Sequence, residues 1–503
     1  MAIPANCTVL VVGGGPAGSY TASVLAREGI DTVLLESEAF PRYHIGESLL
    51  PSSRYFLDFI DLYDKFNNHG FVQKTGAAFK FVPDARVDEY TDFLAAGGAG
   101  NHAWNVIRAE ADDLLFRHAG DSGAKAFDGV KVTEIQFAAS PDEPGRPISA
   151  SWARKGGSTG DIAFEYLVDA SGRAGLVSTQ YMKNRHFNPG LKNVATWGYW
   201  TGIRTYEKGT PRENAPYFEG LTDGSGWVWY IPLHDGTTSV GVVLQQAQAS
   251  VKRKGMGHAD FYHATLQEAP NVARLMDGAQ LQSGLKSASD WSYHASTYAG
   301  PFLRIIGDAG CFIDPLFSSG VHLAMATGLS AAVTICAAHR GDCSEEAAGS
   351  WHTKKVTESY TRFLLVVTSA LEQIYGRDRH ILNELEEMDF GRAFAHFRPI
   401  IQGTIDAGGK LSRSKAAQSV DFCVQVLQKV LASTAENGAT RKGEPDTGAL
   451  GLIRPDDRSR EPVRKIMQMH RVLDLSHFTT DVIDGMASNV QRGDLGLVRA
   501  IDK

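Results

Sequence analysis

The chain has 503 residues and a mass of 54.5 kDa, enough for a large core with a second structural unit attached. Its 43% hydrophobic and 21% charged residues are ordinary for a soluble protein, and no stretch approaches the ~18 uninterrupted apolar residues of a membrane span. A net charge of −7 without a block of lysine or arginine argues against nucleic-acid binding.

The chain start and the cysteines indicate the compartment. Residues 1–6 lack a basic region followed by an apolar stretch, so no secretory or transit signal is expected and the predicted location is the cytoplasm. The five cysteines are scattered, odd in number and without a CxxC spacing. We therefore expect reduced thiols, no disulfide framework, no structural zinc site and no other bound metal.

The first 36 residues predict a β-α-β unit. Residues 8–12 are β-branched and apolar, the glycine run GGGPAG follows at 13–18, and residues 19–28 have helical composition closed by Gly29 in a left-handed cap. Residues 31–36 return as a second strand. The unit implies two parallel strands.

The glycine run fits the dinucleotide fingerprint GxGxxG. Its first glycines permit a tight turn that brings backbone N–H groups to a pyrophosphate at a helix N-terminus, and Gly18 lets the helix pack close to the strand. Glu36 ends the second strand, where a carboxylate binds a ribose hydroxyl and repels the extra phosphate of NADP. FAD and NAD remain, and a glycine turn without a ligand is the alternative.

The middle of the chain, residues 79–300, mixes β-rich segments such as 193–200 and 239–244 with turn-rich connections, which predicts a mixed or antiparallel substrate sheet. Residues 141–160 are dense in Pro, Gly, Ser and Asp and are expected to form an exposed loop. From residue 344 the pattern becomes helical, with five apolar residues on one side of 351–375, and residues 435–462 are expected to be a mobile loop. The predicted division is a core over 1–340 and a C-terminal helical region over 341–503.

Three segments resemble motifs of the flavoprotein hydroxylase superfamily. Residues 303–314 place an apolar strand before Gly-Asp-Ala-Gly, which resembles the second FAD signature, with Asp308 at the ribityl chain; a helix cap is its alternative role. Residues 104–108 with Asp112 are similar to the arginine stretch that contacts the flavin. Residues 168–173 are similar to a turn near the pyrophosphate. A surface arginine and an ordinary turn are the alternatives for these two. The resemblance favours FAD over NAD.

Three further segments narrow the resemblance to flavin-dependent halogenases. Residues 227–232, WVWYIP, match the WxWxIP marker of that family, although such tryptophans are usually core residues. Residues 312–321 match its Phe-x-x-Pro segment, where backbone amides near Ser319 and Gly320 bind chloride. Lys74 falls where these enzymes carry the lysine that receives or positions hypochlorous acid, and Lys80 is the nearby competitor.

The sequence most resembles the fungal phenolic (polyketide) halogenases, and segments 41–48, 289–293 and 360–365 extend the likeness over most of the first 370 residues. The resemblance implies a Rossmann-type FAD-binding domain of the flavoprotein monooxygenase superfamily, a mixed substrate sheet and a C-terminal helical unit. It also implies chlorination of an electron-rich phenolic natural product with O2, chloride and reduced FAD from a separate flavin reductase, through hypochlorous acid. The expected site comprises catalytic Lys74, chloride-binding Ser319 and Gly320, and cofactor-binding Gly13, Gly14, Gly15, Ala17, Gly18, Glu36, Arg42, Glu47, Arg108, Asp308 and Val321.

Two alternatives stay open: an FAD-dependent phenol hydroxylase, and a non-catalytic FAD-binding scaffold. One departure bears on the substrate, because tryptophan halogenases carry a glutamate where Phe317 stands here. A phenol is activated by its own oxygen and needs such a carboxylate less than an indole does. The departure agrees with a phenolic substrate and leaves the general base unidentified. A lysine held in an apolar interior would have a lowered pKa, which suits it to act as a donor or a nucleophile toward the oxidant.

Overall fold

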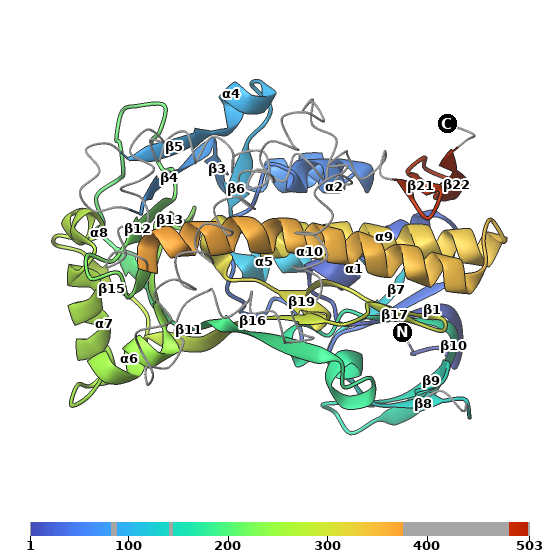
Figure 1. The fold of residues 1–503 in the computed structure, drawn as a ribbon. Coiled ribbons are helices and arrows are strands. Elements are labelled where there is room, and N and C mark those ends of the chain that lie inside the picture. Colours follow the sequence, from blue (N-terminus) through green and yellow to red (C-terminus); the bar gives the residue numbers. More distant parts are fainter. Residues whose placement is uncertain (1, 82–87, 140–143, 376–481, 501–503) are drawn as a thin grey trace, which may run out of the picture.

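The computed structural model describes residues 2–81, 88–139, 144–375 and 482–500, and its elements form two large sheets joined by long central helices (Figure 1). The predicted β-α-β unit is confirmed. Strand β1 (Asn6–Val12), helix α1 (Pro16–Arg27) and strand β2 (Thr32–Leu35) follow one another, and Gly29 has φ +79° just after the helix. Strands β1 and β2 pair in parallel. Because a parallel strand is covered on both faces, the four residues of β2 are all buried and apolar or Thr.

The first sheet carries the glycine loop. Its strands lie in the order β17-β18-β10-β1-β2-β7, and β8 and β9 extend it from β10. The pairs around β1 are parallel, as the dinucleotide-binding interpretation requires. The other strands of this sheet are β7 (Lys125–Phe127), β8 (Val130–Phe137), β9 (Pro147–Arg154), β10 (Thr159–Asp169), β17 (Ala299–Gly300) and β18 (Leu303–Ile305).

The prediction of a loop over 141–160 is wrong for residues 147–154 and 159–160, which lie in strands. Residues Pro147–Arg154 form β9, which pairs antiparallel with both β8 and β10. The polar composition misled the prediction because only Pro147 and Ala150 of this strand are buried, and its other residues are partly or fully exposed. A strand with one solvated face needs no continuous apolar run.

The second sheet confirms the expected mixed substrate sheet. Its order is β19-β16-β11-β14-β13-β12-β4-β5, with β15 added at β11, and only the β4–β12 pair among them is parallel. The strands are β4 (Gly76–Lys80), β5 (Glu89–Asp92), β11 (Arg185–Thr201), β12 (Tyr217–Gly220), β13 (Gly226–Pro232), β14 (Thr238–Gln245), β15 (Gln280–Leu281), β16 (Lys286–Ala295) and β19 (Cys311–Phe312). A short separate pair joins β3 (Val72–Lys74) to β6 (Ala103–Asn105).

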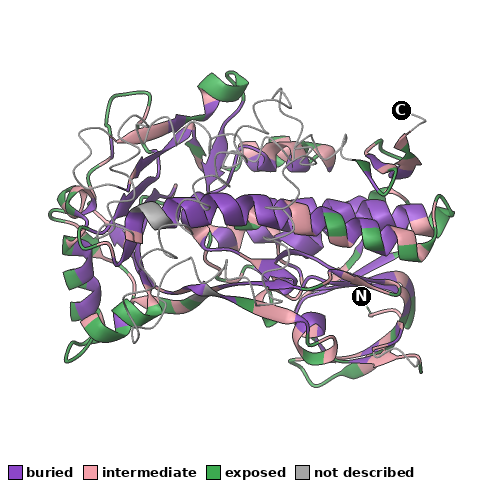
Figure 2. Cartoon of the chain, in the orientation of Figure 1, coloured by how far each residue is buried: buried purple, intermediate pink, exposed green. Residues whose placement is uncertain are grey.

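Helices fill the space between and around the sheets. The helix α9 (Gly320–Arg340) lies alongside α10 (Glu345–Tyr375) across the middle of the molecule, and both are largely buried (Figures 1 and 2). Among the described helices α9 alone is long and apolar enough to cross a membrane, but 94% of its apolar window is buried in protein, as in a core helix. The remaining helices are α2 (Ser53–Phe59), α3 (Tyr63–Asn67), α4 (Phe93–Gly97), α5 (Arg108–Asp121), α6 (Gln246–Lys252), α7 (His258–Gln267) and α8 (Pro270–Leu275).

The C-terminal region differs from the helical prediction at its end. Helix α10 matches the expected helix, and its five predicted core residues, Phe363, Leu364, Val367, Leu371 and Ile374, are all buried. The last described residues are strands instead: β20 (Val482–Ile483), β21 (Met486–Asn489) and β22 (Gly496–Arg499) form a small sheet beside α9. The predicted loop over 435–462 and Cys423 lie outside the described residues.

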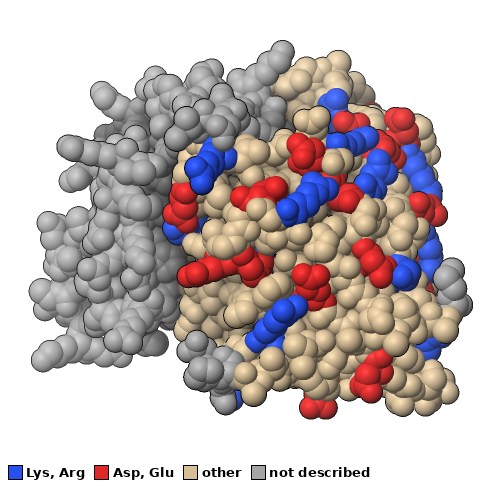
Figure 3. All heavy atoms as spheres, turned by 90° about the vertical axis from the view of Figure 1, so that its right-hand side faces the viewer, with Lys and Arg blue, Asp and Glu red and all other residues tan. Residues whose placement is uncertain are grey.

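The surface agrees with the charge pattern of the sequence. On the face drawn in Figure 3, basic and acidic side chains are interspersed over the described residues. The four cysteines that the structure describes, Cys7, Cys311, Cys336 and Cys343, are free thiols.

Candidate active site

The glycine loop has the shape that a pyrophosphate needs. Gly13 has φ +106°, and a side chain there would overlap the Ala170 carbonyl, while a side chain at Gly18 would overlap the Gly13 carbonyl. Both glycines are therefore required by backbone packing. Gly15 caps α1 without a side chain, and no acidic residue stands in the first turn of that helix. The helix N-terminus thus presents its amides to an anion.

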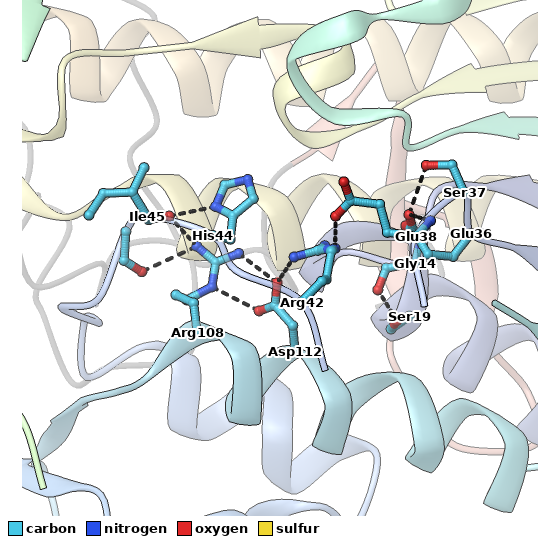
Figure 4. Close-up of polar contacts among 11 residues, drawn as sticks. Gly14, Ser19, Glu36, Ser37, Glu38, Arg42, His44, Ile45, Arg108 and Asp112 are labelled. Atoms are coloured by element: carbon cyan, nitrogen blue, oxygen red, sulfur yellow. Dashed lines mark hydrogen bonds and ion pairs between the residues drawn. The ribbon is translucent and has the colours of Figure 1, made fainter. Parts of the chain in front are cut away.

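Glu36 lies beside this loop, as predicted. Its buried carboxylate accepts a 2.6 Å hydrogen bond from the Gly14 amide, a 2.8 Å bond from the Glu38 amide and a 3.0 Å bond from the Ser37 hydroxyl (Figure 4). These contacts fix the carboxylate at the carboxyl end of β2, next to the start of α1. This is where a ribose hydroxyl would reach it.

The second predicted FAD motif meets the first. Gly307 has φ +55°, and a Cβ placed on it would lie 3.0 Å from the Cβ of Ala17 in the first turn of α1. Asp308 follows in a short 3-10 turn that leads into β19, so the alternative role as the cap of a following helix does not apply. Burial raises the pKa of Asp308 to about 6, against the opposing charges of Arg173 and Arg108.

A buried charged network links α5 to the segment before Lys74. Arg108 binds both carboxylate oxygens of Asp112 at 2.8 and 3.0 Å and also donates to the carbonyls of Ile45 and Gly46. Arg42 donates to the same carboxylate at 2.9 Å (Figure 4). Burial alone would raise the pKa of Asp112, but the Arg108 guanidinium holds it below its ordinary value. The alternative of a solvated surface arginine at position 108 is wrong, because that side chain is 6% exposed.

The turn over residues 168–173 lies directly against the glycine loop. Val12 and Asp169 are partners in the parallel pairing of β1 with β10, and Asp169 accepts from the amides of Ser171 and Val177 at 3.0 and 2.7 Å. The Asp169 side chain therefore shapes the turn. Arg173, two residues after Ser171, is partly exposed, and its positive charge opposes the rise in the pKa of Asp308.

Glu47 was expected at the cofactor, but its partner Tyr199 was not foreseen. The Tyr199 hydroxyl donates to a Glu47 carboxylate oxygen at 2.6 Å, and the other carboxylate oxygen is buried without a hydrogen bond among the described residues. Burial raises the pKa of Glu47 to about 7, against the hydrogen bond from Tyr199. Tyr199 lies more than 150 residues away on β11, and no local pattern in the sequence predicts its contact with Glu47.

Lys74 is buried at the end of β3, with 2% of its surface exposed. Its ammonium nitrogen donates to the Ser48 hydroxyl and to the Leu49 carbonyl, both at 2.9 Å, and lies 5.2 Å from the centre of the Phe93 ring. Burial lowers the pKa of Lys74 to about 7. Lys80, its competitor in the sequence, is partly exposed at the end of β4.

A small cavity connects Lys74 with the predicted chloride segment. Four of its nine described lining residues are phenylalanines, and Lys74 is the only charged residue among these nine. The lining residues are Leu50, Lys74, Ala77, Phe79, Thr91, Phe93, Phe218, Phe317 and Ser318. The lysine and the residues just before α9 thus line one small pocket, although they are about 240 positions apart in the sequence.

The segment after this cavity forms an open helix start. Ser318 has φ +58°, Ser319 caps α9 without a side-chain hydrogen bond, and its buried hydroxyl has no partner among the described residues. Gly320 and Val321 begin the helix, and its first turn holds no acidic residue. Space beside Gly320 is open, since no atom lies within 4 Å of the position of a Cβ there. Small residues and free amides at the start of a 21-residue helix suit a small anion.

The tryptophans of the WxWxIP segment lie in the core, as their packing alternative predicts. Trp227 and Trp229 are 1% and 5% exposed on β13, with ring centres 6.0 Å apart. Trp229 donates to the Ser239 hydroxyl at 3.0 Å, and a side chain at Gly241 would overlap its ring. The motif therefore packs the core of the second sheet.

The comparisons with known proteins agree with this arrangement. The family model described as tryptophan halogenase matches residues 8–91 and 87–370. The chain is 51% identical to the flavin-dependent halogenase ascD of Acremonium egyptiacum and 48% identical to the sulochrin halogenase gedL of Aspergillus terreus, over 99% of this chain and 93% and 94% of those proteins. The myxobacterial chondrochloren halogenase CndH, an FAD-dependent halogenase, has a similar structure, with 26% identity, a TM-score of 0.64 and coverage of 85% of this chain and 98% of that one.

This chain therefore belongs to the flavin-dependent halogenases, and it is an enzyme that uses reduced FAD and a halide. The glycine loop, Glu36 and the Asp308 turn fit that cofactor in the structure, because bare amides and close backbone packing meet at the start of α1.

Proposed function

We propose that this enzyme chlorinates an electron-rich phenolic natural product of polyketide type. The observation that carries the proposal is the shared cavity: Lys74 and Ser318, which lies just before α9, line the same small pocket together with four phenylalanines. One relative, 48% identical, is named for sulochrin, a phenolic polyketide. Phe79 and Phe218, whose ring centres lie 5.1 Å apart, give the pocket an apolar aromatic surface on which a phenolic ring can stack.

The lining also supports a phenol as the substrate. No carboxylate is among the described residues that line the cavity, and Phe317 stands where the resemblance to tryptophan halogenases would place a glutamate. A phenol ring is nucleophilic ortho and para to its own hydroxyl, so its halogenation does not require a carboxylate to remove an indole proton. The chemistry that the protein must supply is therefore positioning and the exclusion of water.

The residues around the glycine loop hold the cofactor in this proposal. Gly13, Gly14, Gly15, Ala17 and Gly18 receive the pyrophosphate, Glu36 the ribose, and Asp308 the ribityl chain, while Arg42, Glu47, Arg108 and Val321 surround the rest of FAD. Reduced FAD, when bound, activates O2 for the oxidation of the halide to hypohalous acid. The amides at Ser319 and Gly320 hold the chloride beside it.

Lys74 receives the oxidant at the substrate end of the cavity. Two of its hydrogen bonds go to Ser48 and Leu49, so its nitrogen has one position left for the cavity, either an N–H or a lone pair. That position can hold or accept the electrophilic chlorine opposite the ring carbon to be chlorinated. A separate flavin reductase supplies reduced FAD, and the cytoplasm is the proposed location.

The test uses the purified full chain with a flavin reductase, FAD, NADH, chloride and a panel of polyketide phenols. Mass spectrometry should show products with one chlorine isotope pattern and no hydroxylated product. The Lys74→Met variant should bind FAD normally but lose product formation by at least about 100-fold, because its positioned amine is gone. Lys80→Met, a change of the same chemistry on the next strand, should keep wild-type activity. A Lys74→Met enzyme that halogenates at the wild-type rate, or a wild type that only hydroxylates, contradicts the proposal.

A further inference from the structure

Two histidines and a glutamate gather outside the cavity described above. His69 follows α3, Glu110 stands in the first turn of α5, and His234 lies just after β13. The Nε2 atom of His69 lies 2.7 Å from one carboxylate oxygen of Glu110, and the Nε2 atom of His234 lies 3.2 Å from the same oxygen. All three potential ligand atoms lie within 4.8 Å of one another.

Both imidazole rings contact the same aromatic residue. Phe71 lies 4.4 Å from the ring of His69 and 5.4 Å from that of His234, measured between ring centres. The Nδ1 atom of His234 is buried and has no hydrogen-bond partner among the described residues. The contact of Nε2 with Glu110 therefore orients the His234 ring. Both histidines present Nε2 to the same carboxylate oxygen of Glu110.

The donor set suits a transition metal. Tetrahedral Zn²⁺ with ligands at ~2.0–2.2 Å separates neighbouring donor atoms by about 3.3 Å. The 3.2 Å distance from His234 to Glu110 lies close to that value, whereas His69 and Glu110, at the hydrogen-bond distance of 2.7 Å, must move apart by about 0.6 Å when the ion binds. Two imidazoles and one carboxylate suit Zn²⁺ and similar divalent ions better than Ca²⁺ or Mg²⁺, which prefer oxygen donors. Side-chain exposures of 29%, 38% and 22% leave room for an ion to enter and for water as a fourth ligand.

From this geometry we propose that His69, Glu110 and His234 form a Zn²⁺ site that cross-links three segments of the enzyme. The sequence, judged by its cysteines alone, predicted no metal. The site joins the segment five residues before Lys74, the helix turn that carries Arg108, and the end of the WxWxIP strand. None of its three ligands lines the cavity at Lys74, so its role is to stabilise the arrangement of these segments.

The experiment measures metal binding to the full chain after removal of any affinity tag. Protein treated with EDTA and exchanged into metal-free buffer is loaded with Zn²⁺, passed through a desalting column and analysed by mass spectrometry for bound metal. The wild type should retain one Zn²⁺ per chain, and Co²⁺ in its place should give the intense visible absorption of a tetrahedral site. Zn²⁺ should also raise the thermal midpoint of the wild type.

Three variants complete the design. The double variant His69→Ala, His234→Ala should lose both the retained metal and the thermal shift. The isosteric Glu110→Gln should bind Zn²⁺ more weakly, and it provides the test if the double variant fails to fold. His339→Ala removes a partly exposed histidine beside Glu165 and should keep the full metal content. Equal Zn²⁺ retention by the wild type and Glu110→Gln, or no retained Zn²⁺ in the wild type, would overturn the proposal and leave the cluster as hydrogen-bonded ion pairs only.

Discussion

The buried Lys74 amine should make the stability of the enzyme depend on pH in a way that one substitution removes. Burial lowers the pKa of Lys74 to about 7 in the folded chain, whereas an exposed lysine in the unfolded chain titrates near ~10.4. Between these values the unfolded chain binds a proton at Lys74 that the folded chain does not bind. The contribution of Lys74 to stability therefore rises as the pH rises, and it falls as the pH drops toward 7.

The magnitude follows from linkage. Each pH unit well inside this window changes the free energy of unfolding by about 1.4 kcal/mol, and the half-protonated state near pH 7 reduces the total to about 2 kcal/mol between pH 7 and pH 9. In Lys74→Met this titration is absent. The substitution also deprives Ser48 and Leu49 of a donor, but that loss adds the same cost at every pH and leaves the difference in slope unchanged.

Urea denaturation at pH 7, 8 and 9, followed by tryptophan fluorescence, measures the effect. The stability of the wild type relative to Lys74→Met should rise by about 2 kcal/mol over this range. Lys80→Met is the matched control and should parallel the wild type, because Lys80 is partly exposed. Parallel pH dependences for the wild type and Lys74→Met would refute the reasoning that burial, and not local solvation, sets the pKa of this amine.

Three further predictions concern the cofactor side of the site. Gly18→Ala should lose bound FAD, measured as the ratio of flavin to protein absorbance, because the new methyl overlaps the Gly13 carbonyl. Gly120→Ala, which has open space around it, should retain FAD. Equal FAD retention by both variants would contradict the packing argument. Glu36→Ala should weaken FAD binding by about 10- to 100-fold in a fluorescence titration, the value of a hydrogen bond to a charged group, and an unchanged Kd would remove Glu36 from the ribose site. Arg108→Met should lower the free energy of unfolding by about 3 kcal/mol, because it leaves the buried Asp112 with Arg42 as its remaining partner. A loss of less than about 1 kcal/mol in a urea titration would show that Asp112 does not depend on Arg108 for its charge compensation.

Much of the cofactor side could be predicted from the sequence because its requirements are local. The conformations of Gly13 and Gly18 follow from a strand that turns directly into a helix, and Glu36 lies one strand further along the same β-α-β unit. The prediction over 147–154 failed for a local reason too, because this strand buries only two of its residues and its composition resembles that of a loop. At the chain end, the strands over 482–499 were assigned to a helical region because no periodic pattern in so short a segment distinguishes them.

The arrangement of the substrate side was decided by the tertiary structure. The sequence by itself determined that a strand, glycine loop and helix bind a dinucleotide, and that Lys74 and Ser319 carry family motifs. Only the fold shows that Lys74 and Ser318 share one cavity and that Tyr199 meets Glu47. The physical reason is that these contacts join residues more than 150 positions apart, and their proximity depends on how the two sheets and α9 pack. The glycine loop, in contrast, is defined by hydrogen bonds and steric overlaps within one short segment and its immediate neighbours.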